Sequence, residues 1–78
     1  MVVYILYSDS IGQYYVGITA DLEDRLKRHN SRRSKFTKRG APWKVVKVIK
    51  VSDRSEALRL EAKIKSRGIQ RWLDSNDL

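Results

Sequence analysis

The chain has 78 residues, enough for one small domain over residues 1–78, with no cysteine and one histidine. These counts exclude disulfides, thiolate metal sites and a zinc site made of several histidines. The formal net charge is +8. So large an excess on a small domain predicts a polyanionic partner, most often nucleic acid. No segment has the pattern of a basic amphipathic helix or a membrane span, so a membrane partner is not expected.

Two apolar runs near the N-terminus predict a β-hairpin. Residues 2–7 and 14–18 are rich in β-branched and aromatic side chains, and the polar residues 8–13 between them include a glycine. A symmetric loop places Leu6 opposite Tyr15 and Tyr4 opposite Gly17.

The hairpin brings two tyrosines to one face of the sheet. Because side chains alternate along a strand, Tyr4 and Tyr15 become diagonal neighbours, roughly 7–8 Å apart. Gly17 is expected to leave open space in front of Tyr4, so that the two phenols border a pocket. Paired aromatic residues are also ordinary core packing, and the hairpin alone leaves both interpretations open.

Residues 22–30 predict an amphipathic helix. Asp21 is a suitable N-cap, and Asp24 follows three residues later, as in a capping box. Arg25 and His29 are one turn apart beside the apolar stripe, so both side chains can point toward the edge of the sheet. The alternative is a surface arginine and an ordinary helix-terminal histidine.

Residues 31–42 predict a basic loop in which short polar side chains and one aromatic residue separate the charges. This composition suits contacts to phosphates and one stacked base. The alternative is a solvated charged surface. The candidate nucleic-acid-binding residues are Arg32, Arg33, Lys35, Lys38 and Arg39.

Residues 43–51 predict a third strand. Lys44, Lys47 and Lys50 interrupt its apolar residues, which is typical of an edge strand protected against pairing with other molecules.

A second helix is expected to begin after Asp53 and to end at Gly68, followed by a short last helix and a frayed end at residues 75–78. Glu61 lies within the buried stripe of the second helix. A carboxylate there is costly unless it is paired or binds a metal ion. Glu61 is therefore a candidate metal ligand; the alternatives are a pair with Lys65 or a place at the wet edge of the stripe.

Taken in order, these residues resemble the GIY-YIG nuclease superfamily, in particular its small standalone bacterial members. The resemblance extends from Val2 to about Leu73. Its elements are Val3-Tyr4-Ile5, Tyr15-Val16-Gly17, Arg25, His29 and Glu61. Val3 stands where the family has a leading glycine.

The resemblance implies an α+β fold, a three-stranded antiparallel sheet flanked by helices in the order β-β-α-β-α-α. It also implies phosphodiester hydrolysis with one divalent ion, Mg²⁺ or Mn²⁺. Glu61 would hold the ion and Arg25 would stabilise charge on the phosphoryl group. Tyr4 or Tyr15 would orient or deprotonate the attacking water, with His29 available to relay a proton.

The leading functional hypothesis is a small metal-dependent DNA endonuclease with a structure-specific or repair-related role. The alternative is a non-catalytic nucleic-acid-binding module of the same fold that acts with a partner protein. DNA, including branched or single-stranded DNA, is expected ahead of RNA. The absence of cysteine and of a signal peptide predicts a cytoplasmic protein, associated with the nucleoid when bound to DNA.

Overall fold

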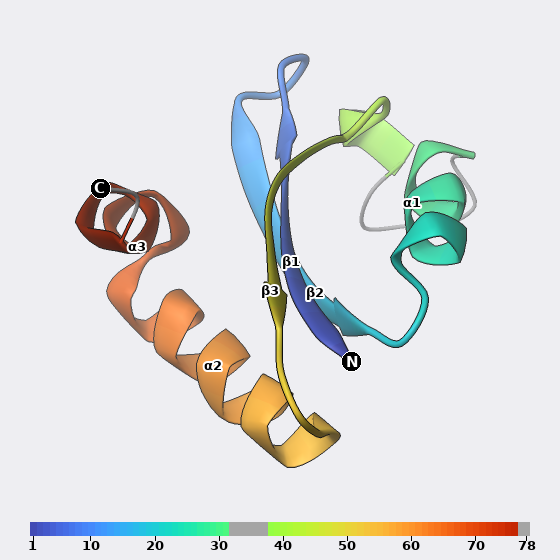
Figure 1. Cartoon of the computed structure of the whole chain (residues 1–78). Helices are drawn as coiled ribbons and strands as arrows, with labels where there is room; N and C mark the ends of the chain where they lie inside the picture. Colours follow the sequence, from blue (N-terminus) through green and yellow to red (C-terminus); the bar gives the residue numbers. More distant parts are fainter. Residues whose placement is uncertain (32–37, 77–78) are drawn as a thin grey trace.

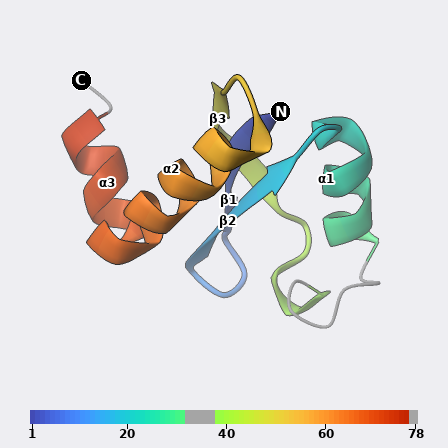
Figure 2. The same cartoon turned by 90° about the horizontal axis from the view of Figure 1, so that it is seen from below.

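The computed structural model describes residues 1–31 and 38–76. The elements are β1 (Val2–Ser8), β2 (Gln13–Thr19), α1 (Leu22–Asn30), the short 3-10 helix η1 (Lys38–Gly40), β3 (Lys44–Lys50), α2 (Arg54–Arg67) and α3 (Ile69–Asn76). Apart from η1, this order is the predicted one. Figures 1 and 2 show α1 on one side of the sheet and α2 with α3 on the other, which confirms the α+β architecture.

The sheet has the strand order β2-β1-β3, and both pairings are antiparallel. The hairpin has the predicted register, with the Cα partners Tyr4–Gly17, Leu6–Tyr15 and Tyr7–Tyr14. In the turn, the Gly12 N–H donates to the Ser8 carbonyl at 2.8 Å, and Gly12 has a φ of 63°. Glycine adopts this left-handed conformation without the steric cost of a Cβ, so the turn chemistry and the register agree.

β3 is an edge strand, as its lysines predict, although it is shorter than the predicted residues 43–51. Its register against β1 shifts between Ile5 and Leu6, whose partners are Lys47 and Val45. Val46 is therefore the extra residue of a bulge, and bulges are common at sheet edges.

The alternation of side chains divides the interior into two clusters. The α2-side cluster contains Val3, Ile5, Val16, Ala57, Ile64, Trp72 and Leu73. The α1-side cluster contains Tyr4, Leu6, Ala41 and Trp43, with Tyr15, Leu22 and Leu26 packed against it. Val3, the neighbour of Tyr4 on β1, thus lies on the other face of the sheet and is fully buried in the α2-side cluster.

The predicted N-caps of the two long helices are both present. The Asp21 carboxylate accepts from the Asp24 N–H at 3.1 Å, and the Asp53 carboxylate accepts from the Glu56 N–H at 2.8 Å. The reciprocal half of a capping box at α1 does not form as predicted, because the Asp24 carboxylate pairs with Arg28 at 3.2 Å. Each cap satisfies an N–H that has no partner inside its helix.

The C-terminal helices follow the predicted break. Gly68 ends α2 with a φ of 94°, and its N–H donates to the carbonyl of Ile64 at 3.0 Å. α3 extends to Asn76, so Ser75 and Asn76 continue a helix where a frayed end was expected; residues 77–78 lie outside the described residues. Within the described part of the chain, no helix is long and apolar enough to cross a membrane.

Candidate active site

Tyr4 lies in the middle of β1, with its ring over the backbone of Gly17 on β2. The phenol oxygen and ring carbons of Tyr4 lie where a Cβ at position 17 would be. The Tyr4 side chain is only 1% exposed. The space predicted in front of Tyr4 is therefore filled by its own ring, and the prediction of an open pocket there is wrong. A side chain at position 17 would displace the ring.

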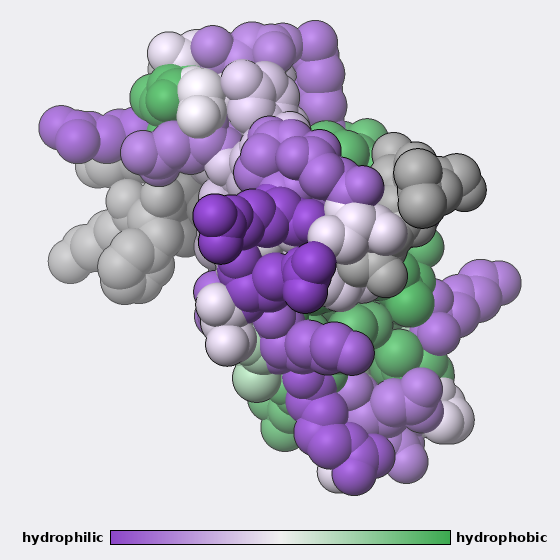
Figure 3. Space-filling model, turned by 90° about the vertical axis from the view of Figure 1, so that its left-hand side faces the viewer, coloured by the Kyte–Doolittle hydropathy of each residue, from purple (hydrophilic) through white to green (hydrophobic). Residues whose placement is uncertain are grey.

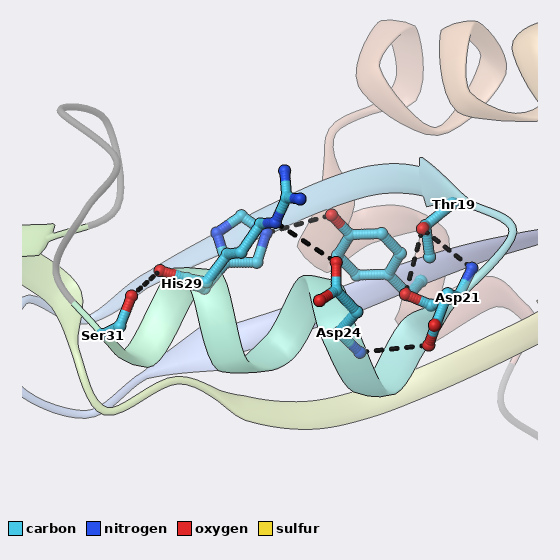
Figure 4. A network of polar contacts seen from close by, with 7 residues as sticks. Thr19, Asp21, Asp24, His29 and Ser31 are labelled. Carbon is cyan, nitrogen blue, oxygen red and sulfur yellow. Dashed lines mark hydrogen bonds and ion pairs between the residues drawn. The ribbon is translucent and has the colours of Figure 1, made fainter.

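Three rings meet on the α1-facing side of the sheet. The Tyr4 hydroxyl and His29 Nε2 are 3.0 Å apart, within hydrogen-bonding distance. The Tyr15 ring lies edge-on to the imidazole, with centroids 4.8 Å apart, and its centroid is 6.3 Å from that of Tyr4. Figure 4 shows His29 near the C-terminal end of α1, with the capping contacts of Asp21 at the other end of the helix. The hairpin and α1 thus bring these three predicted site residues into contact.

His29 is a buried, neutral imidazole. Burial lowers its pKa below 6.5, and the positive charge of Arg25 lowers it further. Its Nδ1 atom is buried and has no hydrogen-bond partner among the described residues. A buried polar atom without a partner costs free energy, and its presence in a native fold calls for a functional explanation.

Tyr4 is held in its protonated form. Burial raises the pKa of its hydroxyl, and the neighbouring Tyr15 phenol and the Glu61 carboxylate raise it further, while the Arg25 guanidinium lowers it. A hydroxyl that keeps its proton donates best to an unprotonated nitrogen. Donation to an unprotonated Nε2 of His29 would leave the ring proton on Nδ1, whereas an Nε2–H would donate to the hydroxyl; the direction depends on the tautomer of His29.

Arg25 and Glu61 act on this ring cluster from different helices. Arg25 lies on α1, one turn before His29, and it is half-buried. Glu61 lies on α2, and its side chain is 21% exposed. Both charges affect the pKa of Tyr4: the Arg25 guanidinium lowers it and the Glu61 carboxylate raises it.

Glu61 also has the partner that was weighed as the alternative to a metal ion. Lys65 Nζ lies 3.8 Å from Glu61 Oε2, one helical turn away, and the Lys65 side chain is 59% exposed. Ion pairs this long and this exposed contribute little to stability. Lys65 can therefore turn toward solvent at small cost and leave the carboxylate open to another cation.

The available donors fit a metal ion shared with substrate rather than a closed protein site. Among the described residues, no group of three or more His, Cys, Asp and Glu side chains could hold a metal ion. Mg²⁺ keeps several waters and is often bound through one or two carboxylates together with substrate phosphates. A single carboxylate such as Glu61 is compatible with that kind of coordination.

The predicted basic loop is only partly described. Arg32, Arg33 and Lys35 lie outside the described residues. Lys38 begins η1, and Arg39 in the same turn is exposed. The predicted nucleic-acid-binding set therefore stays a prediction.

A clamp at the base of this loop was missed by the sequence analysis. The Asn30 side chain accepts from the Trp43 N–H through Oδ1 and donates to the Trp43 carbonyl through Nδ2 at 3.3 Å. The indole of Trp43 packs on Gly40, and its ring centroid is 6.2 Å from that of Tyr15. The only signal in the sequence is that Asn30 and Trp43 flank the basic stretch, a separation that does not predict contact.

The fold and the ring cluster define a small α+β domain with a polar site on one face of a β-hairpin. The family model for the GIY-YIG catalytic domain matches residues 1–70 of the chain. The chain therefore belongs to the GIY-YIG family and has its nuclease-type fold. Neither a curated protein nor a solved structure matches the chain.

Proposed function

We propose that the protein hydrolyses phosphodiester bonds of DNA with the help of a divalent metal ion. The observation that carries the proposal is the buried contact between Tyr4 and His29, beside Tyr15 and under the charges of Arg25 and Glu61. Perturbed pKa values and a partnerless buried nitrogen cluster at functional sites more often than in ordinary cores. Membership of the GIY-YIG family supports the same chemistry.

The two tyrosines take different roles in this proposal. Tyr4 is 1% exposed and its pKa is raised by burial, so it is poorly placed to take a proton from water. Tyr15 is only half-buried and lies against the imidazole edge. Tyr15 is therefore the residue that orients the attacking water, and Tyr4 fixes the position of His29. His29 accepts protons from the site, as a neutral imidazole can.

Arg25 stabilises the transition state. Its guanidinium charge already lowers the pKa of both Tyr4 and His29, so its field reaches the place where these groups meet. A planar guanidinium also matches two oxygens of a phosphoryl group. Negative charge that develops on those oxygens is stabilised more strongly in a partly buried site than in water.

Glu61 would hold one Mg²⁺ or Mn²⁺ ion. Such an ion, when bound, supplies Lewis-acid stabilisation of the phosphoryl oxygens. The partly buried carboxylate faces an exposed, displaceable lysine, which supports this assignment. The +8 net charge and the basic stretch at residues 31–42 support DNA as the substrate. Phosphate oxygens of the DNA would complete the coordination of the ion.

The test is incubation of supercoiled, branched and single-stranded DNA with Mg²⁺ or Mn²⁺, comparing wild type with Glu61→Gln. Glu56→Gln is the matched control, because it removes another carboxylate of α2, one that accepts a hydrogen bond from the Ser52 N–H. We expect nicking by wild type and by Glu56→Gln and none by Glu61→Gln. Cleavage by Glu61→Gln at the wild-type rate would contradict the proposal. DNA binding without any cleavage would favour the non-catalytic binding module.

A further inference from the structure

The net charge of the chain is confined to one stretch of sequence. Residues 31–51 contain eight of the 17 Lys and Arg residues and none of the nine Asp and Glu residues. The rest of the chain therefore carries nine charges of each sign and is neutral. The basic residues of the stretch whose side chains the structure describes are Arg39, Lys44, Lys47 and Lys50. Three of these four lie on β3, outside the loop to which the sequence analysis assigned nucleic-acid binding.

The outer edge of β3 is open. In the described part of the chain β3 pairs only with β1, and Figure 1 shows it as the front strand of the sheet with no helix in front of it. Val45, Val46 and Val48, between the lysines, are 41–45% exposed. An uncovered strand edge with these exposed side chains is available to a partner.

The geometry points to the outer edge of β3 as a nucleic-acid-binding track in which Lys44, Lys47 and Lys50 hold backbone phosphates. The inference rests on the proposed function for the nature of the partner. It extends the binding surface from the loop to a strand whose lysines were first interpreted only as protection against aggregation.

The length and position of the strand fit this role. Six residue steps separate Lys44 from Lys50, which is roughly 20 Å of extended chain. Successive phosphates of one DNA strand rise by about 3.4 Å, so the edge spans about six nucleotides. β3 is hydrogen-bonded to β1, and Val48 lies opposite Tyr4. The outer edge of β3 is therefore separated from β1, the strand that carries Tyr4, by the width of one strand.

The charge of the edge decides between nucleic acid and a second copy of the chain. Pairing of two β3 strands would align three lysines from each copy along one seam. Like charges opposite each other across strands are destabilising, so the edge disfavours self-association. A polyanionic backbone gains from the same charges through the release of its counterions. An acidic peptide adding to the strand edge is the competing polyanion, and the experiment separates it from DNA.

The test is binding of a fluorescein-labelled DNA duplex of mixed sequence across a series of salt concentrations, in EDTA so that no cleavage occurs. The variant is Lys47→Gln with Lys50→Gln, which leaves the ion pair between Lys44 and Asp9, at 2.6 Å, in place. The matched control is Arg59→Gln with Lys63→Gln, which removes the same charge from exposed positions of α2. Figure 3 shows the side of the molecule bearing α2 and α3 as largely hydrophilic, so these changes disturb little packing.

We expect the β3 double variant to flatten the slope of log K against log salt by about 1.8, the value for two lost phosphate contacts. The α2 double variant should leave the slope within about half of that change. Equal flattening by both variants would show a response to total charge alone and would overturn the inference. An unchanged slope in the β3 variant would overturn it as well.

A labelled polyglutamate peptide separates the competing partner. If the β3 double variant loses peptide binding but keeps the wild-type DNA slope, the edge is a protein-binding site and the inference is wrong. Thermal unfolding of both double variants checks that each is folded. Because the assay contains no divalent ion, its outcome is independent of whether the protein cleaves DNA. A protein that binds through β3 without cutting refutes the proposed chemistry and not the track.

Discussion

The two faces of the sheet are built from neighbouring residues of the same strands, yet they differ in kind. The buried members of the α2-side cluster are all apolar, with Val3, Ile5 and Ile64 fully buried. On the α1 side, the buried layer includes a tyrosine hydroxyl on a neutral histidine and an unpaired ring nitrogen. One face stabilises the fold, while the other keeps polar groups out of water at a cost in free energy.

The difference shows that this small protein confines the free-energy cost of buried polar groups to one face of the sheet. A domain of about this size buries only roughly 60–65% of its unfolded surface, so its stability margin is small. Confining the polar groups to one face leaves the other free to pack without unsatisfied atoms. Substitutions in the buried α2-side cluster should therefore change stability, and substitutions in the ring cluster of Tyr4, Tyr15 and His29 should change chemistry.

The largest effect is expected from Ile64→Ala in the α2-side cluster. Ile64 is fully buried, and truncating a buried isoleucine costs about 2–5 kcal/mol of unfolding free energy. Chemical denaturation measures this loss. Leu58→Ala on the same helix is the control, because Leu58 is 46% exposed and should cost well under about 1 kcal/mol. Equal losses in the two variants would show that the α2-side cluster does not dominate stability.

Arg25→Gln should damage chemistry on the opposite face with little effect on stability. Loss of one electrostatic stabiliser of a transition state typically lowers the rate by about 10²- to 10³-fold. Because the charge of Arg25 lowers the pKa of His29, the variant should also have a higher His29 pKa. Single-turnover cleavage and an NMR titration of the imidazole provide the two readouts. An unchanged His29 pKa would contradict the electrostatic coupling between the two side chains.

His29 should make stability depend on pH. Its pKa is lowered in the folded state from 6.5, so as the pH falls below about 6.5 the unfolded chain binds a proton that the folded protein does not. The free energy of unfolding should therefore fall toward acid pH, by at most about 1.4 kcal/mol per pH unit from this group. Thermal unfolding between pH 7.5 and 5, compared with His29→Gln, isolates the effect. Parallel pH profiles for the two proteins would contradict it.

Lys65→Gln should have the smallest effect. The Lys65–Glu61 pair is long and exposed on the lysine side, so its loss should change stability by less than about 1 kcal/mol. Cleavage should be unchanged or faster, because the Glu61 carboxylate loses a competing cation. Denaturation and cleavage at several Mg²⁺ concentrations measure both quantities. A strong loss of cleavage would place Lys65 in the chemistry and would change the role given to Glu61.

The sequence predicted the sheet better than the site. The hairpin register followed from two apolar runs and a symmetric turn, since a one-residue slip would move every side chain to the other face. The helix ends followed from Asp21, Asp53 and Gly68, whose caps depend on local chemistry. These features depend on residues close together in the chain, which is why pattern and spacing were enough.

Features set by contacts between distant residues were not predictable in the same way. An absent Cβ at Gly17 indicated room, but it could not show that the Tyr4 ring would fill it. The Asn30–Trp43 clamp joins residues 13 positions apart across the basic stretch. Burial raises the pKa of Tyr4, while the charge of Arg25 lowers it. The balance between the two effects depends on packing and not on spacing in the sequence.

The most direct test of the division between the two faces is single-turnover cleavage by Tyr15→Phe and Tyr4→Phe, with thermal unfolding of each variant. Both changes keep the ring and remove one hydroxyl, so stability should change by only about 1 kcal/mol. Cleavage should slow by roughly 10²-fold or more in Tyr15→Phe, the usual scale for a group that acts on the proton of the nucleophile. Tyr4→Phe should also slow cleavage, because the imidazole of His29 loses the hydroxyl that fixes its position. Near-normal cleavage rates in both variants would reduce the α1 side to core packing and contradict the account.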